Sequence, residues 1–113
     1  MLINKTKNIV ISKDVRYCRN IFSKAKGLMF SRKIDKPLIF LFSKEKRVSI
    51  HMFFVFFPID VIYLNKNKEV IYIKENAKPF TLLRAINCNY IIEIEEGGAE
   101  RYKIEKGDIV KFD

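Results

Sequence analysis

The residues that most constrain this chain are 48–64, VSIHMFFVFFPIDVIYL. They include four of the ten Phe residues and the only His. A run of 17 residues is close to the shortest helix that crosses a bilayer, about 17 residues. The charged Asp60 inside it would cost roughly 2.5–3.5 kcal/mol at the middle of a membrane helix. We therefore interpret the run as the core of a globular domain and predict no membrane span.

The length and composition predict one folded domain. A chain of 113 residues is long enough for a single core, so we take residues 1–113 as one unit. With 49% hydrophobic and 31% charged residues, the composition is that of an ordinary globular protein and excludes a disordered chain. The first eight residues lack the apolar segment of a signal peptide. We therefore expect a cytoplasmic protein.

The two cysteines, Cys18 and Cys88, do not indicate a metal site. They lie seventy residues apart, form neither CxxC nor CxxH, and are accompanied by a single His, which is too few for the usual zinc ligand sets. Gly97 and Gly98 match neither of the phosphate-binding glycine patterns, GxGxxG and GxxxxGK. We predict no metal, no cofactor and two reduced thiols, and a disulfide between the cysteines has only weak support.

The net charge of +9 is concentrated in the N-terminal part. Residues 1–47 hold 13 Lys and Arg against 3 Asp and Glu, a balance of +10, and residues 48–113 hold 9 against 10, a balance of −1. A basic segment suggests an anionic partner such as nucleic acid or a phosphorylated ligand. Because no RNA-binding motif accompanies the charge, a solvated basic surface is favoured and nucleic acid is not. The candidate anion-binding residues are Arg16, Arg19, Lys24 and Lys26.

Apolar residues recur at spacings of three and four after residue 15, which predicts an amphipathic helix. Gly27 suits the end of that helix, where a left-handed residue satisfies the last carbonyl groups. The apolar positions are Val15, Cys18, Phe22, Ala25 and Met29.

Short runs of β-branched and alternating residues predict six or seven strands. They are residues 8–12, 38–42, 48–52, 59–64, 69–74, 90–95 and 109–112. Between them we expect a charged turn at 43–47, a hairpin turn at 65–68, a loop at 80–89 and a helical turn at 99–102. Because closure removes exposed strand edges, the fold expected is mainly β (α+β). It is a small closed β-barrel of mostly antiparallel strands, with one N-terminal helix and a short C-terminal helical turn.

An ordered set of motifs resembles one known family. The motifs are GLMF at residues 27–30, Met52 six residues before PID at 58–60, YIIE at 90–93, GGA at 97–99 and IEKGDIV at 104–110. Over residues 8–113 this order resembles the domain of unknown function 192 family (DUF-192, also uncharacterised protein family UPF-0127). The resemblance implies a small closed β-barrel of complex topology with accompanying helices, and no established activity.

The chain departs from the family pattern at residues 51–55. Members usually have Trp-Met-Lys-Asn-Thr there, and this chain has His-Met-Phe-Phe-Val. If a shared site used the polar residues after the Met, it is lost here or changed into an apolar pocket. The candidate pocket residues are His51, Met52, Phe54 and Asp60.

Two polar residues of this pocket have alternative roles. Histidine ordinarily titrates near neutrality, so His51 is the natural general acid or base, but a hydrogen-bonded residue of the core or its rim is favoured. Asp60 could be a titrating carboxylate at the mouth of a pocket. A carboxylate that accepts hydrogen bonds from the backbone or an arginine is favoured. The candidate arginines are Arg16, Arg32, Arg47 and Arg84.

These observations predict a small cytoplasmic binding or accessory module, with an aromatic pocket or patch near His51 and Asp60 and a basic N-terminal face. Its partner would be a small ligand or another protein, and the chain would be a monomer or homodimer. An enzyme that uses His51 and Asp60 as acid and base is the first alternative, less favoured because no nucleophile can be placed beside His51. The second alternative is a structural subunit of a homo-oligomer, with its apolar surface buried by another copy.

Overall fold

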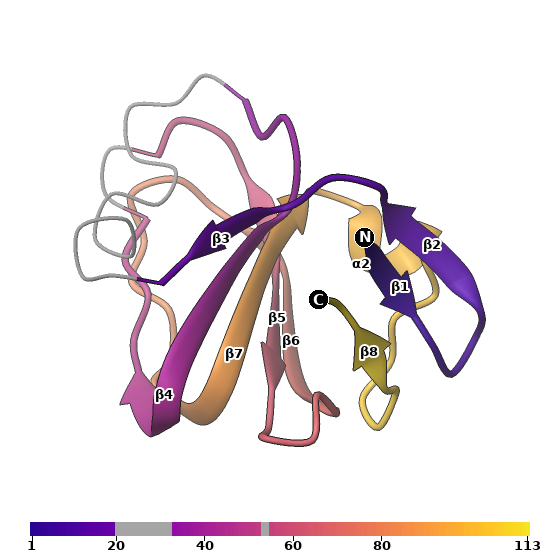
Figure 1. The fold of residues 1–113 in the computed structure, drawn as a ribbon. Helices are drawn as coiled ribbons and strands as arrows, with labels where there is room; N and C mark the ends of the chain where they lie inside the picture. Colours follow the sequence, from indigo (N-terminus) through magenta and orange to yellow (C-terminus); the bar gives the residue numbers. More distant parts are fainter. Residues whose placement is uncertain (20–32, 53–54) are drawn as a thin grey trace.

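The computed structural model describes residues 1–19, 33–52 and 55–113. Within these residues the chain forms eight strands and one short helix, arranged as two sheets (Figure 1). The elements are β1 (Leu2–Asn4), β2 (Ile9–Ser12), β3 (Arg16–Cys18), β4 (Leu38–Val48), β5 (Ile59–Leu64), β6 (Val70–Ala77), β7 (Ile86–Glu95), α2 (Gly98–Arg101) and β8 (Val110–Lys111).

The larger sheet has the strand order β3-β4-β7-β5-β6, and the smaller sheet has the order β2-β1-β8. β3 and β4 are parallel, whereas the other paired strands are antiparallel. β1 and β8 come from opposite ends of the chain and lie side by side in the smaller sheet (Figure 1). The mainly β composition, the mostly antiparallel pairing and the late helical turn are therefore confirmed.

The predicted closed barrel is wrong, because the strands form two separate open sheets. The larger sheet ends in β3 on one side and β6 on the other. β3 is only three residues long, and the outer half of β6 exposes Lys74, Glu75 and Asn76. Short and charged edge strands discourage pairing with other chains. The edges are thus protected without closure.

The predicted N-terminal helix is also wrong where the structure describes it. Residues 16–18 form β3, which pairs with β4 through Arg16 opposite Leu38 and Cys18 opposite Phe40. The remainder of the predicted helix, with Gly27, lies outside the described residues. Valine, tyrosine and cysteine fit a half-buried sheet surface. The pairing with β4 therefore outweighs the helical spacing of the apolar residues.

The other predicted strands are confirmed within a few residues at β2, β5, β6 and β8, as is the hairpin between β5 and β6. β7 contains the predicted strand at 90–95 but begins at Ile86, so the predicted loop at 80–89 is wrong for residues 86–89. The predicted turn at 43–47 is wrong, since β4 continues through it and pairs with β7 beyond an irregularity between Leu41 and Lys46. The predicted strand at 48–52 is reduced to an isolated bridge between His51 and Leu82. Prediction missed β1, whose three residues offer too short a pattern.

β5 is buried on both faces, which explains its continuous apolar run. All six residues of β5 are buried. Alternate side chains point to opposite faces of a strand, so Val61 and Tyr63 join one core cluster and Ile62 and Leu64 the other. The second cluster includes Leu2 from the smaller sheet. The prediction that residues 48–64 belong to the core is confirmed for most of the described residues, but the Phe56 side chain is 56% exposed.

A buried carboxylate joins the N-terminal and C-terminal segments. Asp108 Oδ2 accepts hydrogen bonds from Asn4 Nδ2 at 3.1 Å, Lys7 Nζ at 2.8 Å and the Glu105 amide at 3.0 Å. Burial alone would raise the pKa of Asp108, but the hydrogen bonds from Lys7, Glu105 and Asn4 outweigh it and lower the pKa. These contacts hold the first hairpin against the loop before β8.

Candidate ligand-binding site

The loop between β4 and β5 and the loop between β6 and β7 are joined through their backbones. The Met52 amide donates to the Thr81 carbonyl at 2.6 Å, the Phe80 amide donates to the Met52 carbonyl at 2.7 Å, and the Leu83 amide donates to the Ile50 carbonyl at 2.7 Å. Pro79 precedes this contact, and a proline disfavours the helical conformation at the residue before it. The backbone bonds give the segment 80–83 a defined path across residues 50–52.

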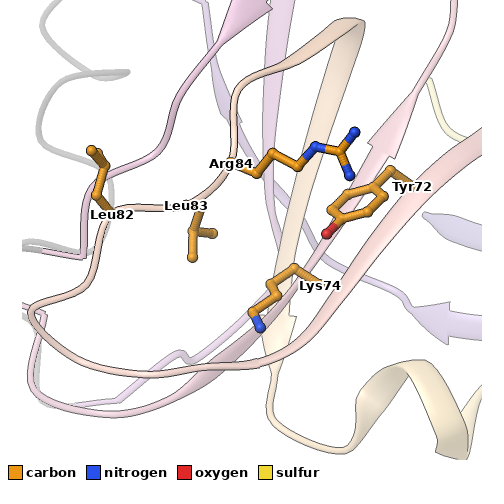
Figure 2. A pocket seen from close by; sticks show the side chains of 5 residues that line it. All are labelled: Tyr72, Lys74, Leu82, Leu83 and Arg84. Atoms are coloured by element: carbon orange, nitrogen blue, oxygen red, sulfur yellow. The ribbon is translucent and has the colours of Figure 1, made fainter.

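From Leu82 to Arg84 the side chains alternate between solvent and core, as in a strand. Leu83 is buried in the core, whereas Leu82 and Arg84 on either side of it are exposed. Tyr72 and Lys74 are likewise two residues apart on β6 and share a face. These five side chains line a hollow of about 170 Å³, and Figure 2 shows that Arg84 extends toward the ring of Tyr72.

The hollow combines positive charge with apolar walls. The Arg84 guanidinium carbon lies 5.7 Å from the centroid of the Tyr72 ring, a cation–π distance. Among the described residues, the ion pairs involve neither Lys74 nor Arg84. Both cations are exposed. The chemistry offered is therefore that of an anion receptor with an aromatic wall and two leucines.

The predicted pocket residues do not all meet at this hollow. His51 is exposed and lies opposite Leu82 in the bridge between the two loops, and Met52 beside it is buried in the core. Phe54 lies outside the described residues. Asp60 is on β5 and is 1% exposed. The sequence thus indicated one of the two loops, and it missed Tyr72, Lys74 and the leucines because they lie on other segments.

The Asp60 carboxylate has a structural role. Its Oδ1 accepts a hydrogen bond from the Asn76 amide and its Oδ2 accepts one from the Ala99 amide, each at 2.9 Å. The favoured interpretation, hydrogen bonds from the backbone, is confirmed, and within the described residues no arginine pairs with Asp60. Of the candidate arginines, Arg32 lies outside the described residues. The carboxylate therefore joins β6 and α2 to β5.

A buried acid that the sequence did not single out lies on β7. Glu93 is 5% exposed, and it pairs with Leu38 of β4 on one side and Val61 of β5 on the other. Burial raises the pKa of Glu93 from an ordinary value of 4.5 to about 7. The sequence did contain a signal for this buried acid, namely a glutamate within the apolar run YIIEI. Because glutamate is rarely buried, its position among core residues marks it as unusual.

A phenol and a thiol lie near this acid on the same side of the sheet. The Tyr63 hydroxyl is buried and has no hydrogen-bond partner among the described residues. Burial and the neighbouring charges of Cys88 and Glu93 raise the pKa of Tyr63. Burial raises the pKa of the Cys88 thiol to about 11. Cys18 and Cys88 are both buried, and no disulfide links these two described residues.

Comparison with known proteins decides the family. The DUF192 family model, described as "Uncharacterized ACR", matches residues 2–112. The chain belongs to the DUF192 family. It is 35% identical over 116 residues to a UPF0127 protein of Thermococcus sibiricus, covering 100% of this chain and 75% of that protein. It is 36% identical over 115 residues to a UPF0127 protein of Pyrococcus horikoshii, covering 99% of this chain and 98% of that protein. The resemblance inferred from the motifs is thus confirmed.

The architecture of this DUF192 protein is shared with a solved structure. A protein of unknown function from Novosphingobium aromaticivorans DSM 12444 superposes with a TM-score of 0.79 at 30% sequence identity, covering 87% of this chain and 74% of that chain. The two-sheet arrangement is therefore a property of related chains. The comparison assigns no ligand or reaction.

The predicted anion-binding residues of this DUF192 protein are only partly described. Arg16 is half-buried on β3, and the Arg19 guanidinium carbon lies 5.1 Å from the Tyr17 ring centroid. Lys24 and Lys26 lie outside the described residues, so a basic N-terminal binding face stays a prediction. In residues 1–19, 33–52 and 55–113, no group of three or more His, Cys, Asp and Glu side chains could hold a metal ion. Nor does this part of the chain contain a helix long and apolar enough to cross a membrane.

Proposed function

We propose that this DUF192 protein is a small binding module whose ligand is an anion with an apolar or aromatic part, bound at the Tyr72–Lys74–Arg84 hollow. The observation that supports this most directly is the pair of cations in the hollow, since the ion pairs of the described residues leave both without a carboxylate. Charge-assisted hydrogen bonds to an anion are about twice as strong as neutral ones. The arrangement therefore favours a carboxylate, sulfonate or phosphate ligand.

The walls of the hollow favour a ligand whose uncharged part is apolar or aromatic. Tyr72 presents an aromatic ring, and Leu82 and Leu83 add apolar surface. A hollow of about 170 Å³ is smaller than the roughly 300–1,000 Å³ of pockets that enclose drug-sized ligands. We therefore expect it to hold one charged group and a neighbouring ring or short chain, with the remainder of the ligand lying over Leu82.

This proposal is preferred to an enzyme that uses His51 and Asp60. Both oxygens of the Asp60 carboxylate already accept backbone hydrogen bonds, and a general base must instead reach the proton that it abstracts. The chemistry of the hollow is recognition of charge and shape. Binding is thus the function that the geometry supports best.

The test compares two ligands of equal shape and different charge. In a titration followed by two-dimensional NMR, 4-phenylbutyrate should shift the amide signals of residues 72–74 and 82–84, and the neutral 4-phenylbutyramide should not. The variants Lys74→Gln and Arg84→Gln should each weaken binding by about 10- to 150-fold, because a hydrogen bond to a charged group contributes roughly 1.5–3 kcal/mol.

A matched control removes the same charge elsewhere. Lys66 is exposed in the turn between β5 and β6, so Lys66→Gln should leave the affinity unchanged. Equal binding of the acid and the amide, or equal weakening by all three substitutions, would count against the proposal. The first result would mean that charge is not recognised, and the second that only the net charge of the chain matters.

A further inference from the structure

We propose that the surface around the hollow docks on an anionic lipid bilayer. Phe56, Phe80 and Leu82 would enter the boundary between headgroups and acyl chains, while Lys74 and Arg84 would meet lipid phosphates. This inference rests on the proposed function and names its ligand class, an anionic phospholipid presented by a membrane surface. The assigned surface is the apolar patch Phe56–Phe80–Leu82 together with the cationic hollow.

The apolar patch is exposed and organised. Phe56 is 56% exposed, Phe80 55% and Leu82 67%. The rings of Phe56 and Phe80 meet edge to face with centroids 5.6 Å apart. Leu82 lies two residues after Phe80 and also lines the hollow with Lys74 and Arg84. Leu82 therefore belongs both to the apolar patch and to the lining of the cationic hollow.

The backbone conformation at Phe80 supports a function for the exposed Phe80 ring. Phe80 has a φ of 62°, in the left-handed region that bulky side chains rarely adopt. Its amide is held by the Met52 carbonyl at 2.7 Å. Strained backbone is retained mainly where surrounding contacts enforce it and where it serves a function. A glycine would relieve the strain here, yet the position carries an exposed aromatic ring.

The charges favour a membrane with negative headgroups. Lys74, Lys78 and Arg84 are exposed in or beside the segments that carry the patch. Glu75 is adjacent to Lys74 on β6, and strand alternation directs its side chain to the opposite face. The whole chain carries a net charge of +9, which draws it toward an anionic surface. Clustered lysines and arginines next to apolar side chains are the usual means of interfacial lipid binding.

The size of the patch favours lipid over a protein partner. A stable protein interface buries about 800 Å² on each partner, and three partly exposed side chains fall well short of that area. A bilayer requires no matching surface, because a few inserted apolar side chains and nearby cations act together. The small area and the flanking cations thus agree with peripheral membrane contact.

The experiment is flotation of the purified full chain with vesicles of phosphatidylcholine, alone or mixed with phosphatidylglycerol. We expect binding only to the mixed vesicles, weakening as salt is added. Phe80→Gly and Leu82→Ser should each weaken this binding by at least fivefold. Val10 is 50% exposed on β2 in the other sheet, so Val10→Ser is the matched control and should bind as the wild type does.

Phe80→Gly also separates docking from folding. Glycine adopts the left-handed conformation without strain, so this variant should unfold at the same temperature as the wild type or at a higher one while it loses vesicle binding. Binding that both patch substitutions leave unchanged would overturn the proposal, because it would reflect net charge alone. Patch-dependent dimerisation in sedimentation, without vesicle binding, would overturn it in favour of a second copy of the chain.

Binding of the soluble ligand 4-phenylbutyrate distinguishes a failure of the anion-binding proposal from a failure of the membrane-docking proposal. If 4-phenylbutyrate binds at the hollow and mixed vesicles do not bind at low salt, membrane docking is overturned and the anion receptor stands. If neither binds, both proposals fail. If vesicles bind through the patch and Lys74→Gln and Arg84→Gln weaken that binding, the headgroup assignment is supported.

Discussion

Replacing Glu93 with Gln should remove a loss of stability that the wild type suffers as the pH rises to neutral. Glu93 is buried on β7 between Leu38 and Val61, and burial raises its pKa from 4.5 to about 7. The unfolded chain has a glutamate of ordinary pKa. Between these two values the folded protein keeps a proton that the unfolded chain has released, so the free energy of unfolding falls as the pH rises.

The magnitude follows from the size of the shift. One pH unit corresponds to 1.36 kcal/mol, so the rise from 4.5 to about 7 predicts a loss of about 3 kcal/mol between pH 4.5 and pH 8. Below pH 4.5 the group is protonated in both states and contributes no pH dependence. Gln does not titrate, so Glu93→Gln should lack this component at every pH.

Urea unfolding of both proteins at several values from pH 5 to pH 8 measures the effect. The difference in free energy of unfolding between Glu93→Gln and the wild type should grow in favour of the variant by about 2–3 kcal/mol over this range. Glu96 is exposed in the turn before α2, so Glu96→Gln serves as the control and should show a difference that is flat with pH. A flat difference for Glu93→Gln as well would refute the reasoning, because it would mean that the acid is solvated in the folded protein.

Three further predictions concern other buried groups. Asp60→Ala should lower the free energy of unfolding by about 2–6 kcal/mol, since it leaves the amides of Asn76 and Ala99 without an acceptor and each such loss costs roughly 1–3 kcal/mol. Asp60→Asn, which keeps one acceptor oxygen, should lose less. Equal losses for the two variants in denaturant titrations would argue against the backbone bonds as the cause. The pKa of Asp108 is lower in the folded protein than its ordinary value in the unfolded chain. The contribution of the Asp108 carboxylate to the free energy of unfolding should therefore be complete above the ordinary pKa and lost as the pH falls through the lowered pKa. Asp108→Asn should therefore flatten the acid limb of the stability curve, and an unchanged acid limb would contradict this. At pH 8 neither Cys18 nor Cys88 should react with Ellman's reagent until the protein unfolds, because both thiols are buried and the pKa of Cys88 is about 11; rapid reaction of the native protein would show that the core opens.

The elements predicted correctly are those with a strong local pattern. β5 and β7 lie within runs of large apolar residues, and the polar residues 65–68 between β5 and β6 can hardly be anything but a turn. Asn65 shows why that turn forms, since its side-chain oxygen accepts hydrogen bonds from the amides of Asn67 and Glu69. A short polar side chain and its neighbours in sequence are enough for this geometry. No distant contact is required.

The elements predicted wrongly depend on partners far away in the chain. The segment 43–47 is exposed and charged, and only its alignment with β7 makes it part of β4. β3 likewise exists because residues 16–18 lie alongside β4, although the local spacing favours a helix. Hydrogen bonds between strands stabilise the extended conformation of both segments. The amino-acid composition of the segments does not indicate these bonds.

The sequence by itself determined the family and the apolar core segment, and it did not single out the hollow. Only the tertiary structure decided which side chains line the hollow, because Tyr72 and Lys74 come from β6, and Leu82 and Arg84 come from the segment before β7. It also decided that Asp60 supports β6 and α2 through their amides. The physical reason is that periodicity and turn residues report interactions within a few positions of the chain. A hollow and a buried carboxylate are instead defined by groups that only folding brings within bonding distance.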